Sequence, residues 1–269
     1  MGILLHSYRN CPLVVWRFSQ TRQHRNCHRS GRLGDRVGCT LDFKLTFWLK
    51  RSCRQVMSLL ADITARGTEV RTRLRELQPN REYPSDHKTA WLVASVEIAL
   101  EHHNAIWLLI ERKLTGSAFA LVRPLVETVV RAHWINALAT EQQIEQASED
   151  KDVFPKMSDM RDAISQAYRA DRFFQPLLSE WATMCSYTHS GAQQIARRFT
   201  NGEVKPSYTD GEITEVLYLA TFALLLLMRT FFMSMGNQAE ADEVATLHTK
   251  FVNEFIEPLH APGSVIMNS

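Results

Sequence analysis

The feature that most constrains this chain is a long apolar segment, residues 116–139, that carries a single line of charges. The charged residues are Arg123, Glu127 and Arg131, and their four-residue spacing places them on one face of a helix. A helix that is apolar on its other faces is normally buried. Charges on such a helix must be paired with one another or must line a cavity, so this charged line predicts a site.

The rest of the chain downstream of residue 56 also has the apolar periodicity of helices, and strand-like alternation is absent. Helices are expected over residues 57–77, 87–114, 116–139, 157–170, 175–199, 212–235 and 238–255. Residues 140–156 are polar and are interpreted as a loop or a short weak helix, and Ser190–Gly191 as a break within 175–199. The sequence therefore predicts one all-α domain, residues 57–269, folded as an antiparallel bundle of about six or seven helices.

The most apolar of these helices is the only candidate for a membrane span. Its uncharged run, from Val216 to Met228 within residues 216–235, is shorter than the roughly 20 residues that a span requires. Glu215 and Arg229 lie at the ends of this run. A central helix of the bundle is therefore the favoured interpretation.

Residues 1–56 differ from the rest of the chain. They contain eleven Lys and Arg but two acidic residues, whereas the remainder contains 20 basic and 27 acidic residues. This segment shows no sustained periodicity and is interpreted as a basic leader, either a disordered arm or an over-extended start before Met57. A zinc site at its cysteines and an organellar transit peptide are weaker alternatives.

Two exclusions follow from charge and cysteine usage. The acidic body argues against a broad nucleic-acid-binding surface, although a local basic pocket stays open. Four of the five cysteines lie in the leader and only Cys185 lies in the body, which is unlike a secreted disulfide framework. The expected location is the cytoplasm.

Two arginines flank one glutamate on the charged line, so the line has a net charge of +1. Burying that surplus is costly unless another anion joins it. A carboxylate from a neighbouring helix, such as Glu97 or Glu101, would make the line a structural network. Without one, the two guanidinium groups would suit a phosphate or carboxylate ligand, because they bind such groups through paired hydrogen bonds.

Pro124 lies beside the charged line. Its ring removes one backbone hydrogen bond, so it should kink the helix or mark its effective start. Either result frees the carbonyl of Ala120 close to the charges.

The segment Ser186–Gly191 contains the second candidate group, His189. This histidine can serve as a general acid or base, with Tyr187 or Ser190 in its hydrogen-bonding shell, or it can offset the exposed carbonyls of a helix end. If the helix continues beyond Gly191, Arg197 shares the face of His189. A thiol–imidazole pair between His189 and Cys185 is a weaker alternative.

His103 is the third candidate, on the helix before the charged line. It shares a face with apolar residues, which is typical of a hydrogen-bonded core histidine and less often of a ligand-binding one. The sequence contains no nucleotide-binding glycine loop, no GxSxG nucleophile motif and no HExxH, and none of Glu97, Glu101, Glu127 and Glu180 is followed three residues later by a histidine. It therefore predicts no cofactor and no metal.

Two segments carry a resemblance to a known group: HHNAIWLLIERKLTGSAFALVRPLVETVVRAHWI and YTHSGAQQIARR. They resemble uncharacterised bacterial all-helical proteins of a domain-of-unknown-function family that is distantly similar to HEPN-type bundles. The resemblance covers residues 88–200. Its recurrent positions are His103, Gly116, Ser117, Arg123, Glu127, Arg131, His189 and Gly191. HEPN ribonucleases carry an Arg followed four to six residues later by His on one helix, and the candidate site here lacks that pair.

The charged line and the resemblance together predict a site in which Arg123 and Arg131 hold an anion, Glu127 orients them, His189 donates a hydrogen bond, and His103 lies nearby. The resemblance implies a phosphate-bearing ligand or RNA, and a role in bacterial stress or defence. Two alternatives are a metal-independent ribonuclease with His189 as its catalytic acid or base, and a non-catalytic oligomerising scaffold. A homo-oligomer is expected in each case.

Overall fold

The computed structural model describes residues 53–77, 83–84, 86–149, 151–169, 174–200 and 202–256. The proposed leader lies outside the described residues, except that the first helix begins at Cys53, four residues before Met57. The cysteines at positions 11, 27 and 39 are therefore also outside this part of the chain. The interpretation of residues 1–56 as a leader stays a prediction.

The all-α class is confirmed. The helices are α1 (Cys53–Glu76), α2 (His87–Glu111), α3 (Thr115–Ala137), α4 (Glu141–Ser148), α5 (Met157–Ala167), α6 (Gln175–Leu178), α7 (Trp181–Thr188), α8 (Ala192–Ala196), α9 (Asp210–Ser234) and α10 (Gln238–Ile256). Within the described residues the helices are more numerous than predicted, because the chain between α3 and α9 is divided into several short helices. A two-stranded hairpin, β1 (Phe199–Thr200) and β2 (Glu203–Val204), was not predicted.

Short polar side chains fix where the long helices begin. Asp86 caps α2 by accepting a hydrogen bond from the backbone N–H of Thr89, at 2.9 Å. Thr209 caps α9 in a capping box with Glu212. The same motif, Thr140 with Gln143, starts α4, so the polar segment 140–156 contains a stable short helix.

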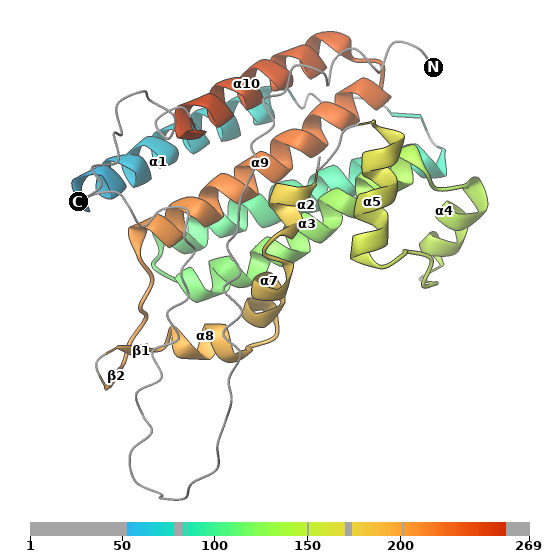
Figure 1. The fold of residues 1–269 in the computed structure, drawn as a ribbon. Helices are drawn as coiled ribbons and strands as arrows, with labels where there is room; N and C mark the ends of the chain where they lie inside the picture. The colour runs from blue at the N-terminus through green and yellow to red at the C-terminus, as the bar shows by residue number, and fades with distance from the viewer. Residues whose placement is uncertain are drawn as a thin grey trace, which may run out of the picture.

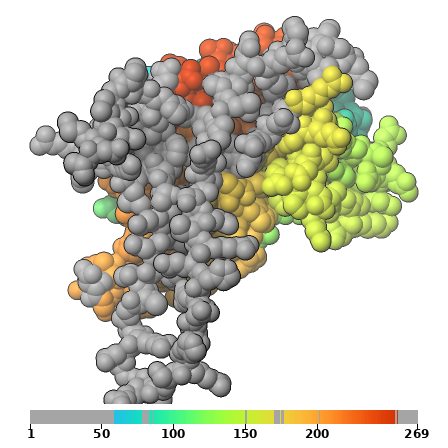
Figure 2. Space-filling model, viewed as in Figure 1, coloured from blue at the N-terminus to red at the C-terminus, as the bar shows by residue number. Residues whose placement is uncertain are grey.

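The bundle is built around α9, which packs against α1, α2, α3 and α10. Figure 1 shows α1 and α10 side by side on one flank, α9 beneath them, and the α2–α3 pair beyond α9. Helices α5 and α7 pack on the far side of α3. In Figure 2 the yellow-green surface of α4 and α5 lies at one end of the molecule and the orange hairpin region at the other. Helix α3 therefore lies between the core and a layer of short helices.

Helix α9 is long and apolar enough to cross a membrane, judged by length and composition alone. Of its most apolar 18-residue window, 83 % is buried inside the bundle, which is typical of a core helix. Two histidines bind its threonines: Nε2 of His103 is 3.1 Å from the Thr221 hydroxyl, and Nε2 of His133 is 3.0 Å from the Thr230 hydroxyl. These bonds satisfy polar groups where α9 meets α2 and α3.

The side chain of Trp107 on α2 reaches α1 at Gly67. This glycine is buried against the ring of Trp107, and a Cβ at position 67 would lie well inside van der Waals contact with the ring. The ring itself is held, because its Nε1 donates to Nε2 of His103 at 3.1 Å. Gly67 is therefore required for the α1–α2 contact.

We expect Gly67→Ala to lower the free energy of unfolding by about 2 kcal/mol, because overpacking outweighs the gain in helix propensity. Chemical denaturation of the variant measures the loss. Thr72→Ala, on the exposed face of the same helix, is the matched control and should change stability little. If the clash with Trp107 is the cause, the double variant Gly67→Ala/Trp107→Phe should lose less stability than the two single variants lose together. Additive losses of stability would contradict the clash as the cause.

Candidate functional site

The charged line on α3 forms as predicted, but it lies at the surface of the bundle. The side chains of Arg123, Glu127 and Arg131 are 22 %, 23 % and 43 % exposed. The expectation that these charges are buried is therefore wrong: the short helices that follow α3 cover this face only in part. Glu97 and Glu101 are both exposed on α2, and no ion pair among the described residues joins them to the line.

The single glutamate is shared unequally by the two arginines. Oε1 of Glu127 is 2.6 Å from Nη2 of Arg131, whereas Oε2 is 3.6 Å from Nη2 of Arg123. The first contact is a charge-assisted hydrogen bond and the second is a longer ion pair. Arg123 is therefore the less neutralised of the two cations.

Aromatic rings hold both guanidinium groups in place. The Arg123 guanidinium lies over the ring of Trp181, 5.1 Å from its centroid, and that of Arg131 lies over Phe154, at 4.6 Å. The Nε–H group of each arginine is buried and has no hydrogen-bond partner among the described residues. Neither ring was predicted from the sequence, although Trp181 lies about two helical turns before His189, at the start of the same helix.

The predicted meeting of Arg123 and His189 is confirmed. Nη1 of Arg123 is hydrogen-bonded to Nε2 of His189, which caps the end of α7 and is exposed. A guanidinium group can only donate, so Nε2 accepts and the neutral imidazole carries its proton on Nδ1. The contact thus joins two groups that are 66 residues apart in the sequence.

Pro124 explains why α7 docks at this place. It lies inside α3 and deprives the carbonyl of Ala120 of its helical partner. The Thr188 hydroxyl lies 3.0 Å from this carbonyl and shares its single proton between it and the carbonyl of Met184, also at 3.0 Å. Thr188 is the last residue of α7 and precedes His189 directly. The expected free carbonyl therefore exists and helps to position the histidine.

Helix α7 ends at Thr188 and α8 begins at Ala192, so the predicted break at Ser190–Gly191 is confirmed and the condition under which Arg197 would share the face of His189 is not met. Ser190 has a φ of 52°, and the backbone N–H of Gly191 turns back to the carbonyl of Ser186 at 2.6 Å. A Cβ at Gly191 would lie 2.5 Å from Oγ of Ser186, which explains the glycine. Arg197 forms an ion pair with Glu212 at the start of α9.

The structure does not bring His103 to the charged line. It is fully buried between α2 and α9, bonded to Trp107 and Thr221. Burial, with a smaller contribution from Arg71, lowers its pKa to about 3, so the ring is neutral. Of the two interpretations of His103 that the sequence allowed, the structure agrees with the hydrogen-bonded core histidine.

A second polar cluster, the tyrosine cluster, lies beside α7 and was not predicted. It joins Tyr187, which is hydrogen-bonded to Arg197, to Tyr208 and Phe119, whose rings pack within 4.9–6.5 Å of one another. Burial raises the pKa of both tyrosines. The hydroxyl of Tyr208 is buried without a partner among the described residues.

Glu215 lies one turn beyond Glu212 on α9, close to the same cluster. Burial raises its pKa to about 8, and the negative charges of Glu212 and Glu180 add to the effect. This carboxyl group therefore holds a proton at neutral pH. Among the described residues, no group of three or more His, Cys, Asp and Glu side chains is arranged to hold a metal ion.

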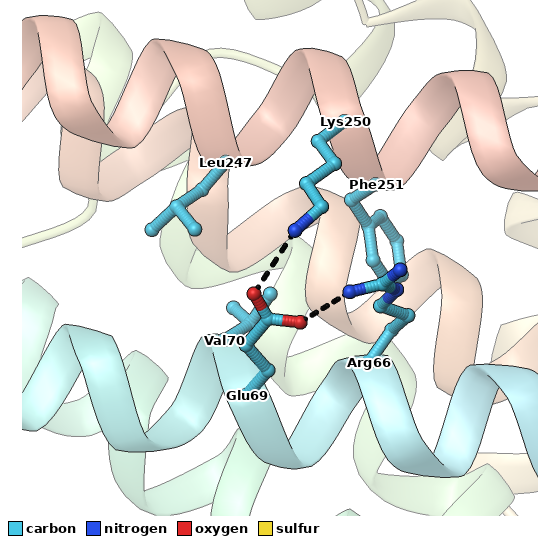
Figure 3. Close-up of a pocket in the computed structure, with 6 residues that line it drawn as sticks. All are labelled: Arg66, Glu69, Val70, Leu247, Lys250 and Phe251. Atoms are coloured by element: carbon cyan, nitrogen blue, oxygen red, sulfur yellow. Dashed lines mark hydrogen bonds and ion pairs between the residues drawn. The ribbon is translucent and has the colours of Figure 1, made fainter.

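A shallow pocket lies elsewhere, between α1 and α10. Figure 3 shows Glu69 of α1 bound to both Arg66 and Lys250; Val70, Leu247 and Phe251 line the same pocket. The two ion pairs are 2.6 and 3.1 Å long. The pocket is separate from the charged line, which lies on the opposite side of α9.

Comparison with protein families identifies the chain. The sequence pattern of the family described as "Family of unknown function (DUF6988)" matches residues 96–257. The chain belongs to this DUF6988 family. No curated protein and no solved structure matches it. The DUF6988 region begins within α2 and includes the charged line, His189 and the tyrosine cluster, so the site lies in the part of the chain that defines the family.

We expect Glu215→Gln to stabilise the protein increasingly as the pH rises from about 4.5 to 8. In this range the unfolded wild-type chain loses the Glu215 proton while the folded protein keeps it, so the wild type becomes less stable. The difference should grow by up to about 1.4 kcal/mol per pH unit. Denaturant unfolding at a series of pH values measures it, with the exposed Glu145→Gln as control. A difference that does not vary with pH would refute the raised pKa.

Proposed function

We propose that this protein is an anion-binding module that takes a phosphate-bearing ligand, a nucleotide or RNA, at Arg123 and His189. The observation that carries the proposal is the unequal sharing of Glu127. Its carboxylate is engaged by Arg131 at 2.6 Å, so Arg123 keeps an excess of positive charge at the surface. A fixed, incompletely neutralised guanidinium is suited to phosphate, which it can bind through two parallel hydrogen bonds.

The surroundings of Arg123 support binding more than packing alone. Trp181 stacks on the guanidinium and restricts its movement, so less entropy is lost when a ligand binds. His189 is exposed beside it and offers an Nδ1–H donor when the ring is neutral.

The Arg123–His189 contact also favours a second function, the metal-independent cleavage of RNA. In that reaction His189 would act as general acid or base, and Arg123 would stabilise the charge that develops on the phosphoryl group. The pair is assembled from two helices, unlike the single-helix Arg and His of HEPN ribonucleases that the distant resemblance implies. The resemblance would also place the protein in a bacterial stress or defence system in the cytoplasm.

The proposal predicts that Arg123→Ala weakens the binding of inorganic phosphate, nucleotides and short RNA by about 10-fold to 100-fold, the value of a charge-assisted hydrogen bond. Calorimetric titration of the full chain measures the dissociation constants. Arg75→Ala, an exposed arginine on α1, is the matched control and should bind as the wild type does. Equal, weak binding by all three proteins would discard the proposal.

The same RNA samples distinguish binding from catalysis. If the wild type cleaves RNA in the presence of a chelator and His189→Ala abolishes the cleavage while still binding, the second function is correct. If the RNA stays intact in the wild type, the chain binds its ligand without cleaving it.

A further inference from the structure

The β1–β2 hairpin is the part of the described chain that protrudes furthest beyond the bundle at the α8 end (Figure 1). Its strands are antiparallel, with Phe199 opposite Val204 and Thr200 opposite Glu203. Gly202, with a φ of 83°, supplies the left-handed conformation that the tight turn requires. No other strand among the described residues pairs with β2, so its outer edge is open.

The cross-strand pair further from the turn, Phe199 and Val204, is apolar and exposed. Phe199 is 57 % exposed and Val204 is 78 % exposed, the largest value for a large hydrophobic residue in the described part of the chain. As cross-strand partners they lie on the same face of the hairpin. Ile195, on α8 just before the hairpin, is also 53 % exposed. Neighbouring exposed apolar residues of this kind are typical of an interaction surface.

The residues on either side of Val204 carry opposite charges. Glu203 lies in β2 and Lys205 directly follows it, where the chain bends; alternation along this extended segment places both on the face opposite Val204. They pair with each other, with 2.6 Å between Nζ and Oε2, and both side chains are largely exposed. A segment with the order acid, apolar, base is complementary to itself when it is reversed.

We propose that two copies of this chain associate through their β2 strands, which pair antiparallel about a two-fold axis at Val204. In this register Val204 lies opposite Val204 of the second copy, and Glu203 lies opposite Lys205. One face of the resulting four-stranded sheet carries a continuous apolar row made of two valines flanked by two phenylalanines. The other face carries alternating charges, each opposite a charge of the other sign.

The occupant is a second copy because the charges require it. A two-fold axis at Val204 reverses the direction of the second copy. Glu203 of each copy then lies opposite Lys205 of the other, which gives two ion pairs across the axis. Strands of two residues provide few main-chain hydrogen bonds, so the dimer should be in equilibrium with the monomer. The association is independent of the anion site, and it gives a physical basis for the expected homo-oligomer.

Sedimentation velocity of the full chain over a range of concentrations tests the interface. We expect a reversible monomer–dimer equilibrium for the wild type. Val204→Asp places two like charges at the axis and should weaken the dimer at least about tenfold. Its circular dichroism and melting temperature should stay unchanged, because position 204 is exposed. A wild type that stays monomeric at all concentrations, or a dimer that Val204→Asp leaves intact, would overturn the proposal.

Charge reversal tests the register itself. Glu203→Lys and Lys205→Glu should each weaken the dimer, because each places like charges opposite one another. The double variant Glu203→Lys/Lys205→Glu should restore it, since positions 203 and 205 are exchanged across the axis. Failure of the double variant to restore dimerisation would exclude this pairing. Phosphate binding at Arg123 should be the same in all of these variants, so the two proposals can fail separately.

Discussion

The site depends on one carboxylate that cannot satisfy two cations equally. Glu127 lies between Arg123 and Arg131 on the same face of α3. Its carboxylate is 2.6 Å from the guanidinium of Arg131 and 3.6 Å from that of Arg123. Had both arginines been buried, a second carboxylate would have been needed. Because the line is half-exposed, water and the rings of Trp181 and Phe154 make the surplus charge tolerable.

The position of this line follows from the packing of two apolar helices. Helix α9 is enclosed by α1, α2, α3 and α10, which leaves α3 to form the outer side of the core. Pro124 then exposes a carbonyl on that outer side, and Thr188 binds it. A single helix-breaking residue thus places the end of α7, and with it His189, against Arg123. The backbone break at Ser190–Gly191 turns the chain away before Arg197 can join.

Periodicity and breakers predicted the class and the long helices well. The Pro124 argument came from the residue type alone, and the meeting of Arg123 and His189 was predicted from the charged line together with the family resemblance. Four features were not predicted, each for a physical reason. Helical spacing predicted that the charged residues share one face of α3. It did not predict how far they are buried, because that depends on how much of this face the short helices cover. His103 had two interpretations that spacing could not separate. The tyrosine cluster and the hairpin join residues through tertiary contacts and a tight turn, neither of which has a helical period.

The central claim is that Arg123 receives an anion beside Trp181, and the indole N–H signals in the NMR spectrum of the ¹⁵N-labelled full chain test it most directly. On titration with inorganic phosphate, the account predicts a saturable shift of the Trp181 signal, assigned with Trp181→Phe. The signal of Trp107 should not move, because its indole N–H is bonded to the buried His103. A Trp181 signal that stays in place, or equal movement of both signals, would contradict the account.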